Sequence, residues 1–247
     1  MRSCRGSGNS WRSVPSETVD FIVPVFNEGK NIGSMLAELY RCVELPKRVL
    51  IVYDRDDDDT LPVVRSLIGQ YEGLTLLRNT RGNGVLNAIR SGIDAATGDV
   101  VIVTMADLSD DPVIANEMVR RIRAGEADVV CASRYMRGGK QIGGGALKKT
   151  LSRLAGLSLF FAGFPVHDAT NAFRAYRREV LKSFEIESKG GFEYSLELTA
   201  KAHAAGFRIV EVPTHWRDRS AGQSRFRLLK WLPRYIRWYL YALTHRP

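Results

Sequence analysis

Short apolar runs alternate with amphipathic stretches through the first hundred residues of the chain. The continuous apolar runs predict buried strands at 19–28, 48–54, 74–79 and 99–105. Stretches with apolar residues at helical spacing predict helices between them, at 31–43, 60–71 and 84–96. Strand and helix therefore alternate through residue 106, which is typical of an α/β fold with a mostly parallel sheet and helices on both faces.

The second half of the chain is less regular. Strands are predicted at 127–135 and 208–219, and helices at 147–163 and within 190–207. Between the first strand and the first of these helices lies the glycine-rich segment 136–145, which we expect to be flexible. The tail, 226–243, is basic and aromatic. We therefore expect an N-terminal lead at 1–18, one catalytic-type domain at 19–226 and an amphipathic tail at 227–247.

Polar residues gather where three of the predicted strands end. Asn27 and Glu28 follow the first strand, the acidic run 54–59 follows the second, and the acidic run 107–111 follows the fourth. In parallel sheets, ligands bind beyond the carboxyl ends of the strands. These three clusters therefore predict one shared crevice.

Five aspartates lie in "DRDDDDT", between positions 54 and 60. Most of them suit a solvated turn that leads into a helix at Thr60, where acidic residues complement the helix dipole. Asp54 stands directly at the strand end, where a carboxylate can accept hydrogen bonds from a base or a ribose. Asp54 is therefore the better candidate for a ligand contact.

The segment "TMADLSDDP", 104–112, ends another buried strand. Asp107 is the obvious oxygen ligand for Mg²⁺ or Mn²⁺, and Ser109 or Asp110 offers a second oxygen. Met105 stands where a clamp of two carboxylates would have its other oxygen. The alternative interpretation is a simple β-turn closed by Pro112.

Two further loops combine glycine with arginine. The loop "RGNG", 81–84, opens a helix but lacks the lysine and spacing of a phosphate-binding motif, so a turn is favoured. The loop "WRDRSAGQSRF", 216–226, contains Arg219 and Arg225. It is either a basic surface loop or a lid whose guanidinium groups bind a diphosphate.

Composition narrows the class of protein. The chain has 247 residues and a net charge of +9, which favours anionic partners such as nucleotide phosphates or an acidic membrane surface. No nucleic-acid-binding module is recognised, so we expect no nucleic-acid partner. The three cysteines have no metal-ligand spacing and suit a reducing cytoplasm. We expect neither a signal peptide nor a membrane-spanning helix, because the longest apolar stretch, 154–166, is short and interrupted by glycine.

Six segments, taken together, resemble the family 2 glycosyltransferases of the GT-A fold. Within that family, the chain is most similar to the dolichyl- or polyprenyl-phosphate sugar synthases of the mannose type. The segments follow the family's order and cover nearly the whole chain: "IVPVFNE", "VYDRDDDDT", "GDVVIVTMADLSDDP", "CASRY", "DATNAFRAYRREVL" and "DRSAGQSRF".

The resemblance implies an inverting transfer of a sugar from a nucleotide-sugar donor to a polyprenyl phosphate. It implies catalytic roles for Asp107 and Arg134, a divalent cation on Asp107 and Ser109, and an acceptor or loop role for Asp168 and Arg174. Donor contacts are implied for Pro24, Phe26, Glu28, Asp54, Asp58, Ala106, Arg219 and Arg225.

One departure from the family's pattern concerns the metal. The first aspartate of the family's D-x-D motif is Met105 here, and the x is Ala106. We therefore expect a weakened site for Mg²⁺ or Mn²⁺, which Ser109 or Asp110 partly restores.

The basic, aromatic tail predicts docking on an anionic membrane, so we expect a cytoplasmic protein that is peripheral on a membrane face. Its C-terminal helices would be amphipathic and lie at the interface. The helical run 147–163 offers a second apolar stripe beside Lys148, Lys149 and Arg153. The alternative for both segments is that they only pack on the domain and close its core.

Two alternative functions stay open. The protein is a family 2 transferase whose acceptor is soluble or a glycan, or it binds a nucleotide sugar without catalysis.

Overall fold

The computed structural model describes residues 17–218 and 228–247, without the side chains of 228–231. Its elements, in chain order, are β1 (Val19–Pro24), α1 (Ile32–Cys42), β2 (Lys47–Tyr53), α2 (Thr60–Leu67), β3 (Leu74–Arg78), α3 (Val85–Ala95), β4 (Val100–Val103), α4 (Ile114–Arg123), β5 (Val129–Ser133), β6 (Lys140–Ile142), α5 (Ala146–Phe161), β7 (Arg174–Arg177), α6 (Arg178–Ser183), α7 (Tyr194–Ala204), β8 (Ile209–Pro213), β9 (His215–Arg217) and α8 (Leu228–Thr244).

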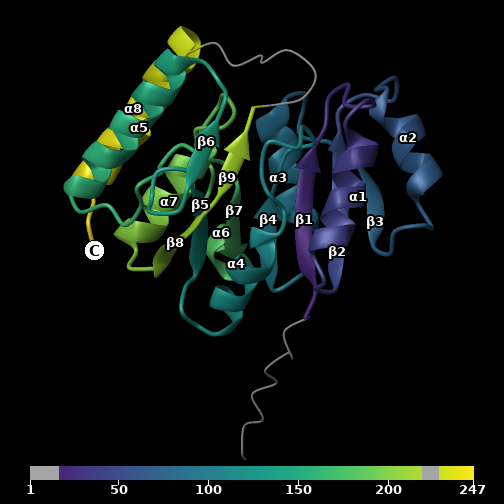
Figure 1. Cartoon of the computed structure of the whole chain (residues 1–247), viewed down its shortest axis with the longest axis horizontal. Helices are drawn as coiled ribbons and strands as arrows, with labels where there is room; N and C mark the ends of the chain where they lie inside the picture. The colour runs from purple at the N-terminus through teal and green to yellow at the C-terminus, as the bar shows by residue number, and fades with distance from the viewer. Residues whose placement is uncertain (1–16, 219–227) are drawn as a thin grey trace, which may run out of the picture.

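One seven-stranded sheet organises the molecule, in the order β3-β2-β1-β4-β7-β5-β8 (Figure 1). Every neighbouring pair is parallel except those formed by β7, which runs antiparallel between β4 and β5. A second sheet pairs β6 with β9. The predicted α/β fold with a mostly parallel sheet is therefore confirmed.

Several elements after residue 106 differ from the sequence prediction. The helices α4 and α6 and the strand β7 were not predicted, and the segment 136–145 contains β6. The single strand predicted at 208–219 is two strands, β8 and β9, that belong to different sheets. The division falls at Thr214, whose N–H donates to Ser133 in β5 at 3.0 Å while its carbonyl accepts from Lys140 in β6 at 2.9 Å. The chain passes from one sheet to the other at this residue.

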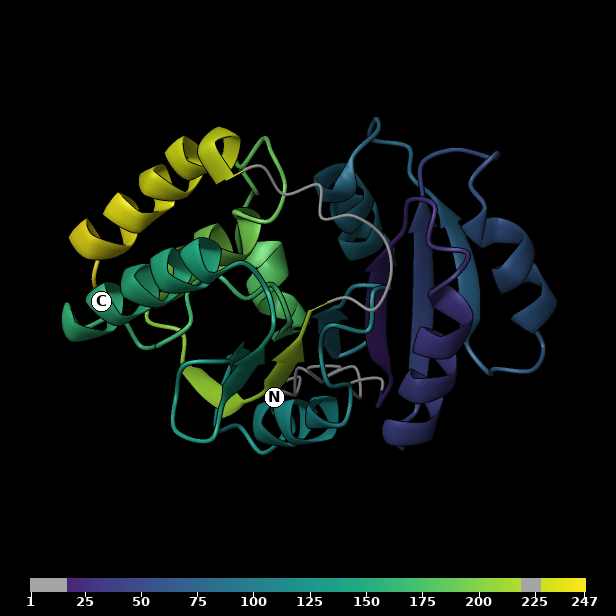
Figure 2. The same ribbon diagram turned by 45° about the horizontal axis from the view of Figure 1, so that its top comes forward.

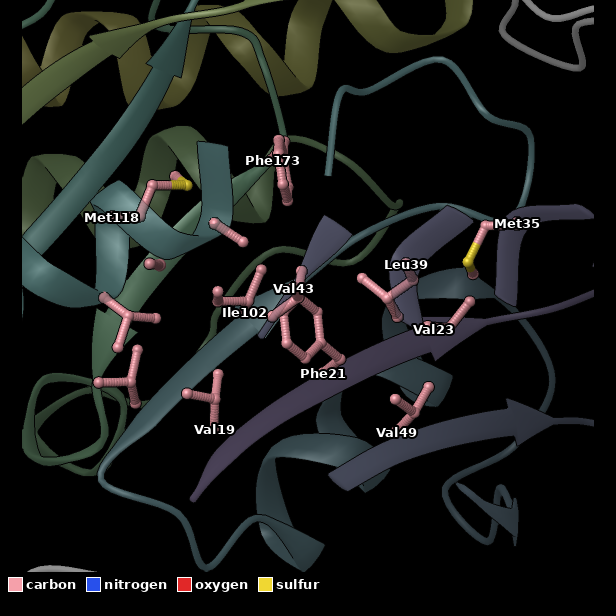
Figure 3. Close-up of a cluster of buried hydrophobic side chains, with 14 of the residues drawn as sticks. Val19, Phe21, Val23, Met35, Leu39, Val43, Val49, Ile102, Met118 and Phe173 are labelled. Atoms are coloured by element: carbon pink, nitrogen blue, oxygen red, sulfur yellow. The ribbon is translucent and has the colours of Figure 1, made fainter. Parts of the chain in front are cut away.

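Helices cover both faces of the large sheet, as the uninterrupted burial of β1 and β4 requires. On one face, Phe21 and Ile102 pack against Leu39 of α1 and Met118 of α4 (Figure 3). On the other face, a second cluster joins the sheet to α3, α5, α6, α7 and α8. Successive side chains of one strand therefore pack into two hydrophobic cores, one on each face of the sheet.

The two helices α5 and α8 lie side by side at one end of the molecule (Figure 2). Ser158 of α5 and Tyr239 of α8 share a hydrogen bond of 2.9 Å. One side of α8 buries Trp238 and Ala242 in the second core. No helix in the described ranges 17–218 and 228–247 has the length and apolar character needed to cross a bilayer.

Candidate active site

The order in which the chain adds strands to the sheet reverses between the parallel neighbours β1 and β4. From β1 the chain moves outward to β2 and β3, and then returns to form β4 on the other side of β1. The loops after β1 and β4 therefore diverge, and α/β sheets bind ligands in the crevice between such loops. Each loop contains a residue with a left-handed backbone, Asn27 at φ 55° and Leu108 at φ 59°, and no other described non-glycine residue has a positive φ. Such conformations cost energy and are concentrated at functional sites.

The loop after β1 is held by the acidic run that follows β2. The buried carboxylate of Asp58 accepts the N–H of Asn27 at 3.1 Å and the N–H of Thr60 at 2.9 Å. The hydroxyl of Thr60 in turn accepts the N–H of Glu28 at 2.9 Å. Pro24 is buried at the end of β1, whereas the ring of Phe26 is 41% exposed. Asp58 therefore shapes the loop that presents Phe26 and Glu28.

Asp54 is held in place at the end of β2. Its Oδ1 accepts the side-chain amide of Asn79 at 2.7 Å, and its Oδ2 accepts the N–H of Gly84 at 2.7 Å. Asn79 itself is buried and accepts both Arg81 N–H at 2.9 Å and the hydroxyl of Ser91 at 2.8 Å. Asn79 was not predicted as a site residue, although its position directly after a strand is the same signal that identified Asp54.

The loop after β4 carries Asp107. Ala106 is buried in the core on one face of the sheet, and Met105 packs against the core on the other face. Asp107 is also buried, and its Oδ1 accepts the N–H of Ser109 at 3.1 Å. The carbonyl of Ser109 accepts the N–H of Arg217 at 2.9 Å, so the end of β9 is attached to this loop.

Asp110, in the same loop, has a buried carboxylate oxygen and a raised pKa. Its Oδ1 is completely buried and has no hydrogen-bond partner among the described residues. Burial, followed by the charge of Asp107, raises the pKa of Asp110 to about 7. An unpaired buried carboxylate oxygen beside a second carboxylate is an environment that suits a hard cation, which takes oxygen ligands. No group of three or more His, Cys, Asp and Glu residues within the described ranges could hold a metal ion.

Arg134, at the end of β5, is bound by Asp168. The guanidinium donates to the two carboxylate oxygens at 2.7 Å and 2.9 Å, and the backbone N–H of Arg134 donates at 3.0 Å. Burial alone would raise the pKa of Asp168, but the charge and hydrogen bonds of Arg134 outweigh it and hold that pKa below its usual value. The Asp168 side chain has no exposed surface, and that of Arg134 is 11% exposed. Asp168 therefore fixes the position of the Arg134 guanidinium.

Two polar residues and two aromatic rings complete the surroundings of Arg134. Its guanidinium donates to Thr170 at 2.8 Å and to Ser152 of α5 at 3.3 Å. The ring of Tyr135 lies 4.9 Å from the guanidinium carbon and the ring of Trp216 lies 5.9 Å from it. Ser152 and Trp216 were not predicted, because only the folded chain brings them to β5.

Arg174 is placed inside the protein. It has no exposed surface and donates to the carbonyls of Asn171 at 2.9 Å and Ala169 at 2.8 Å. It also donates to the Ser195 carbonyl and the Thr199 hydroxyl of α7. In this structure Arg174 connects β7 to α7 and does not reach the crevice. Arg219 and Arg225, predicted to bind a diphosphate, lie outside the described residues.

A family profile and individual related sequences match this chain and agree on one family. The family profile described as "Glycosyl transferase family 2" matches residues 20–184. A polyprenol monophosphomannose synthase of Mycolicibacterium smegmatis is 30% identical over 231 residues, which cover 90% of this chain and 86% of that protein. A dolichol-phosphate mannosyltransferase of Pyrococcus furiosus is 27% identical over 231 residues, 89% of this chain. The match spans only 64% of the length of the Pyrococcus protein.

Comparison with solved structures agrees on the fold. A glucosyl-3-phosphoglycerate synthase from Mycobacterium tuberculosis, in complex with Mn²⁺, UDP and glucosyl-3-phosphoglycerate, has a TM-score of 0.68 at 19% identity over 94% of this chain and 81% of that one. A mannosyltransferase from Pyrobaculum calidifontis, in complex with GDP-Man and Mn²⁺, has a TM-score of 0.62 at 20% identity over 86% of this chain and 59% of that one. At these identities the likeness shows a shared architecture.

Proposed function

This chain belongs to glycosyltransferase family 2, and we propose that it moves a sugar from a nucleotide-sugar donor to a polyprenyl phosphate, with inversion, at a membrane surface. One observation carries the proposal beyond the family. Helix α5 exposes Leu147, Leu151 and Leu154 to solvent while Ser152 of the same helix is bonded to Arg134. One helix therefore exposes an apolar surface and also contacts the cationic Arg134, an arrangement that suits an acceptor with a lipid tail and a phosphate head.

The donor is proposed to bind between the loops after β1 and β2. The exposed ring of Phe26 and the carboxylates of Glu28 and Asp54 offer stacking and hydrogen-bond acceptors to a base and ribose. Each carboxylate oxygen of Asp54 has a second lone pair beyond the bond that it already accepts. Pro24, Asp58 and Ala106 would contribute by shaping the walls of this site.

A divalent cation, Mg²⁺ or Mn²⁺, is proposed to bind at Asp107 and Ser109. The buried oxygen of Asp110, which has no hydrogen-bond partner among the described residues, supports this assignment. When bound, the cation would neutralise charge on the departing diphosphate. Arg219 and Arg225, which follow β9, are proposed to bind the same diphosphate through charge-assisted hydrogen bonds.

Arg134 is proposed to orient the acceptor phosphate. An anionic phosphate oxygen is already a nucleophile, so the protein mainly has to hold it in line with the anomeric carbon. The two hydrogen bonds that the guanidinium donates to Asp168, the one that it donates to Thr170 and the flanking rings keep it in one position. Attack on the face opposite the leaving diphosphate inverts the anomeric centre. The buried Arg174 would support this site by holding β7 against α7.

The proposed membrane surface is formed by α5 and α8. Its exposed apolar residues are Leu147, Leu151, Leu154 and Phe161 of α5 and Leu232, Ile236 and Leu240 of α8. In α8 the three lie four residues apart and form one stripe, distinct from the side that buries Trp238. Helix α5 also carries Lys148, Lys149 and Arg153, and each cation near an anionic leaflet is worth about 1 kcal/mol.

The test is transfer to polyprenyl phosphate in anionic vesicles, with GDP-mannose and UDP-glucose as donors and Mn²⁺ present. We expect one product whose anomeric configuration, measured by NMR, is opposite to that of the donor. Asp107→Ala should abolish transfer and leave the circular dichroism spectrum unchanged. Transfer to 3-phosphoglycerate in place of the lipid would overturn the acceptor and support the soluble-acceptor alternative. A product with retained configuration would overturn the mechanism.

A further inference from the structure

The buried carboxylate of Glu211 in β8 lies behind Asp168, and we infer that Glu211 is a positioning residue for the transfer reaction. It holds the backbone of Asp168, and Asp168 in turn holds the guanidinium of Arg134. The inference rests on the proposed function, in which Arg134 orients the acceptor phosphate. Glu211 acts on the reaction only through these two residues.

The first support is that Glu211 stands in a strand whose other core-facing residues are apolar. Ile209 packs against the core on one face of the sheet, and Val210 and Val212 pack against the core on the other face. Glu211 is in register with Cys131 of β5, which belongs to the same core as Ile209, so its side chain lies on that apolar face. Only 6% of the side chain is exposed. A carboxylate is costly at such a place unless specific hydrogen bonds compensate for its lost hydration.

The second support is the set of groups that this carboxylate binds. Its Oε1 accepts the consecutive backbone N–H groups of His167 at 2.8 Å and of Asp168 at 3.0 Å. Its Oε2 lies 2.6 Å from Nδ1 of His167. Both oxygens are therefore engaged by one short segment between α5 and β7, and Glu211 fixes the backbone of this segment from the side of the sheet.

The third support is that α5 closes on the same segment from the other side. Gly156 of α5 lies so close to the carbonyl oxygen of His167 that even a methyl side chain at position 156 would clash with it. The ring of Phe160 stacks on that of His167, with the ring centroids 3.6 Å apart. The segment is therefore held between β8 and α5, and its position depends on both.

The fourth support is what the segment delivers to the crevice. The hydrogen bonds that the Arg134 guanidinium donates to described residues use Nε and Nη2, which bind Asp168, Thr170 and Ser152. A guanidinium has five N–H donors, so the two on Nη1 are not used by any described residue and are left for an anion. Because the guanidinium is planar and rigid, the position of Nη1 follows that of the Asp168 carboxylate. A shift of the Asp168 backbone would therefore move the group that is proposed to hold the phosphate.

A purely structural role is the competing explanation, and the chain contains a matched comparison for it. Glu197 of α7 is completely buried and accepts the consecutive backbone N–H groups of Glu187 at 2.6 Å and of Ser188 at 2.8 Å. It also accepts a hydrogen bond from Lys201 at 2.8 Å. Glu197 thus makes the same kinds of bond as Glu211, but it holds a segment that has no hydrogen bond to Asp168 or Arg134 among the described residues.

The experiment measures transfer to polyprenyl phosphate by the full chain, at temperatures below unfolding, for Glu211→Ala and Glu197→Ala. Glu211→Ala should lower kcat/KM for the acceptor by about tenfold to a hundredfold, since a misplacement of about 1 Å costs on this scale. The dissociation constant for GDP or UDP, measured by titration calorimetry, should stay at the wild-type value, because the proposed donor site lies between other loops. Glu197→Ala should lower the melting temperature to a similar extent and keep the wild-type kcat/KM for the acceptor.

Two conservative variants separate the position of the carboxylate from its charge. Glu211→Gln keeps an oxygen that can accept both N–H groups, so it should retain most of the wild-type kcat/KM. Glu211→Asp keeps the charge but withdraws it by one methylene group, so it should lose most of that value. If Glu211→Ala does not fold, Glu211→Asp takes its place in the comparison with Glu197→Ala. A folded Glu211→Asp that is as active as the wild type would contradict the positioning role.

The outcomes separate this inference from the proposed function. Equal kcat/KM values for the acceptor in Glu211→Ala and Glu197→Ala would overturn the positioning role and leave the proposed function intact. A parallel loss of affinity for GDP or UDP in Glu211→Ala would also overturn it, because the whole crevice would then be disturbed. A wild-type chain that transfers no sugar to polyprenyl phosphate would overturn the proposed function and this inference together.

Discussion

The carboxylates of the proposed donor loops and of the proposed acceptor site have different partners. After β1 and β2, Asp58 accepts the backbone N–H groups of Asn27 and Thr60, and Asp54 accepts that of Gly84, and neither carboxylate has an ion-pair partner among the described residues. In the β5–β8 half, Asp168 pairs with Arg134 at 2.7 Å and Glu197 pairs with Lys201 at 2.8 Å. Both of these carboxylates also accept backbone N–H groups.

This difference predicts how much stability a substitution removes in each half. A carboxylate that accepts backbone N–H groups fixes the shape of a loop, and its loss leaves neutral donors that water can partly satisfy. A buried pair that loses one member leaves an uncompensated charge inside the protein, which costs far more. The half proposed to bind the donor should therefore tolerate substitutions that the half proposed to bind the acceptor does not.

The largest effect is expected for Asp168→Asn. It leaves the Arg134 guanidinium without its anionic partner in a site with little exposure, so the free energy of unfolding should fall by about 3–5 kcal/mol in urea titrations. The control is Glu117→Gln, which breaks an exposed pair with Arg120 and should cost less than about 1 kcal/mol. Equal losses in the two variants would contradict the larger cost of breaking a buried pair.

The same pair predicts a pH dependence. Arg134 holds the pKa of Asp168 below its usual value, so the stabilisation is present above the unfolded-state pKa of about 3.9 and is lost as the pH falls further toward the folded-state pKa. The wild-type chain should therefore lose more stability than Asp168→Asn between neutral pH and pH 3. Parallel curves for the two proteins would contradict the pairing.

An intermediate effect is expected for Asp58→Ala. The N–H groups of Asn27 and Thr60 lose their acceptor, which should cost about 1–3 kcal/mol of unfolding free energy. Asp58→Asn keeps a side-chain oxygen in the same place and should retain most of the stability. If both variants were equally unstable, the charge of Asp58 and not its hydrogen bonds would hold the loop.

A smaller effect, on ligand affinity, is expected for Asn79→Ala. It removes the amide that positions Asp54, so the dissociation constant for the nucleotide should rise by about fivefold to tenfold, roughly 1 kcal/mol. Titration calorimetry with GDP and UDP measures the change. Asn87→Ala, nearby on α3, is the control and should leave the affinity unchanged.

The smallest effect on stability is expected for Ile236→Glu. The side chain is exposed on α8, so the unfolding free energy should change by less than about 0.5 kcal/mol. Flotation with anionic vesicles should nevertheless decrease, because a charge enters the apolar stripe. Flotation equal to that of the wild type would show that this stripe is not the docking surface.

The first half of the fold could be predicted because its signals are local. Continuous apolar runs and helical spacing gave the alternation from β1 to β4, and polar residues at strand ends located Asp54 and Asp107. The strand β7 was missed, since "RAYR" has no apolar run and its partners β4 and β5 are distant in the sequence. The bonds of Asp168, Ser152 and Arg174 could not be predicted for the same reason. They join residues that only tertiary packing brings together.

The antiparallel strand β7 also has a consequence for synthesis. The strands β1 to β4 can pair as soon as residue 103 has left the ribosome, whereas β5 finds its neighbours only in β7 and β8, which end at Arg177 and Pro213. Until then, one edge of β4 and the whole of β5 remain open to pairing with other chains. A nascent chain halted between residues 133 and 174 is therefore the state in which we expect this protein to aggregate or to need a chaperone.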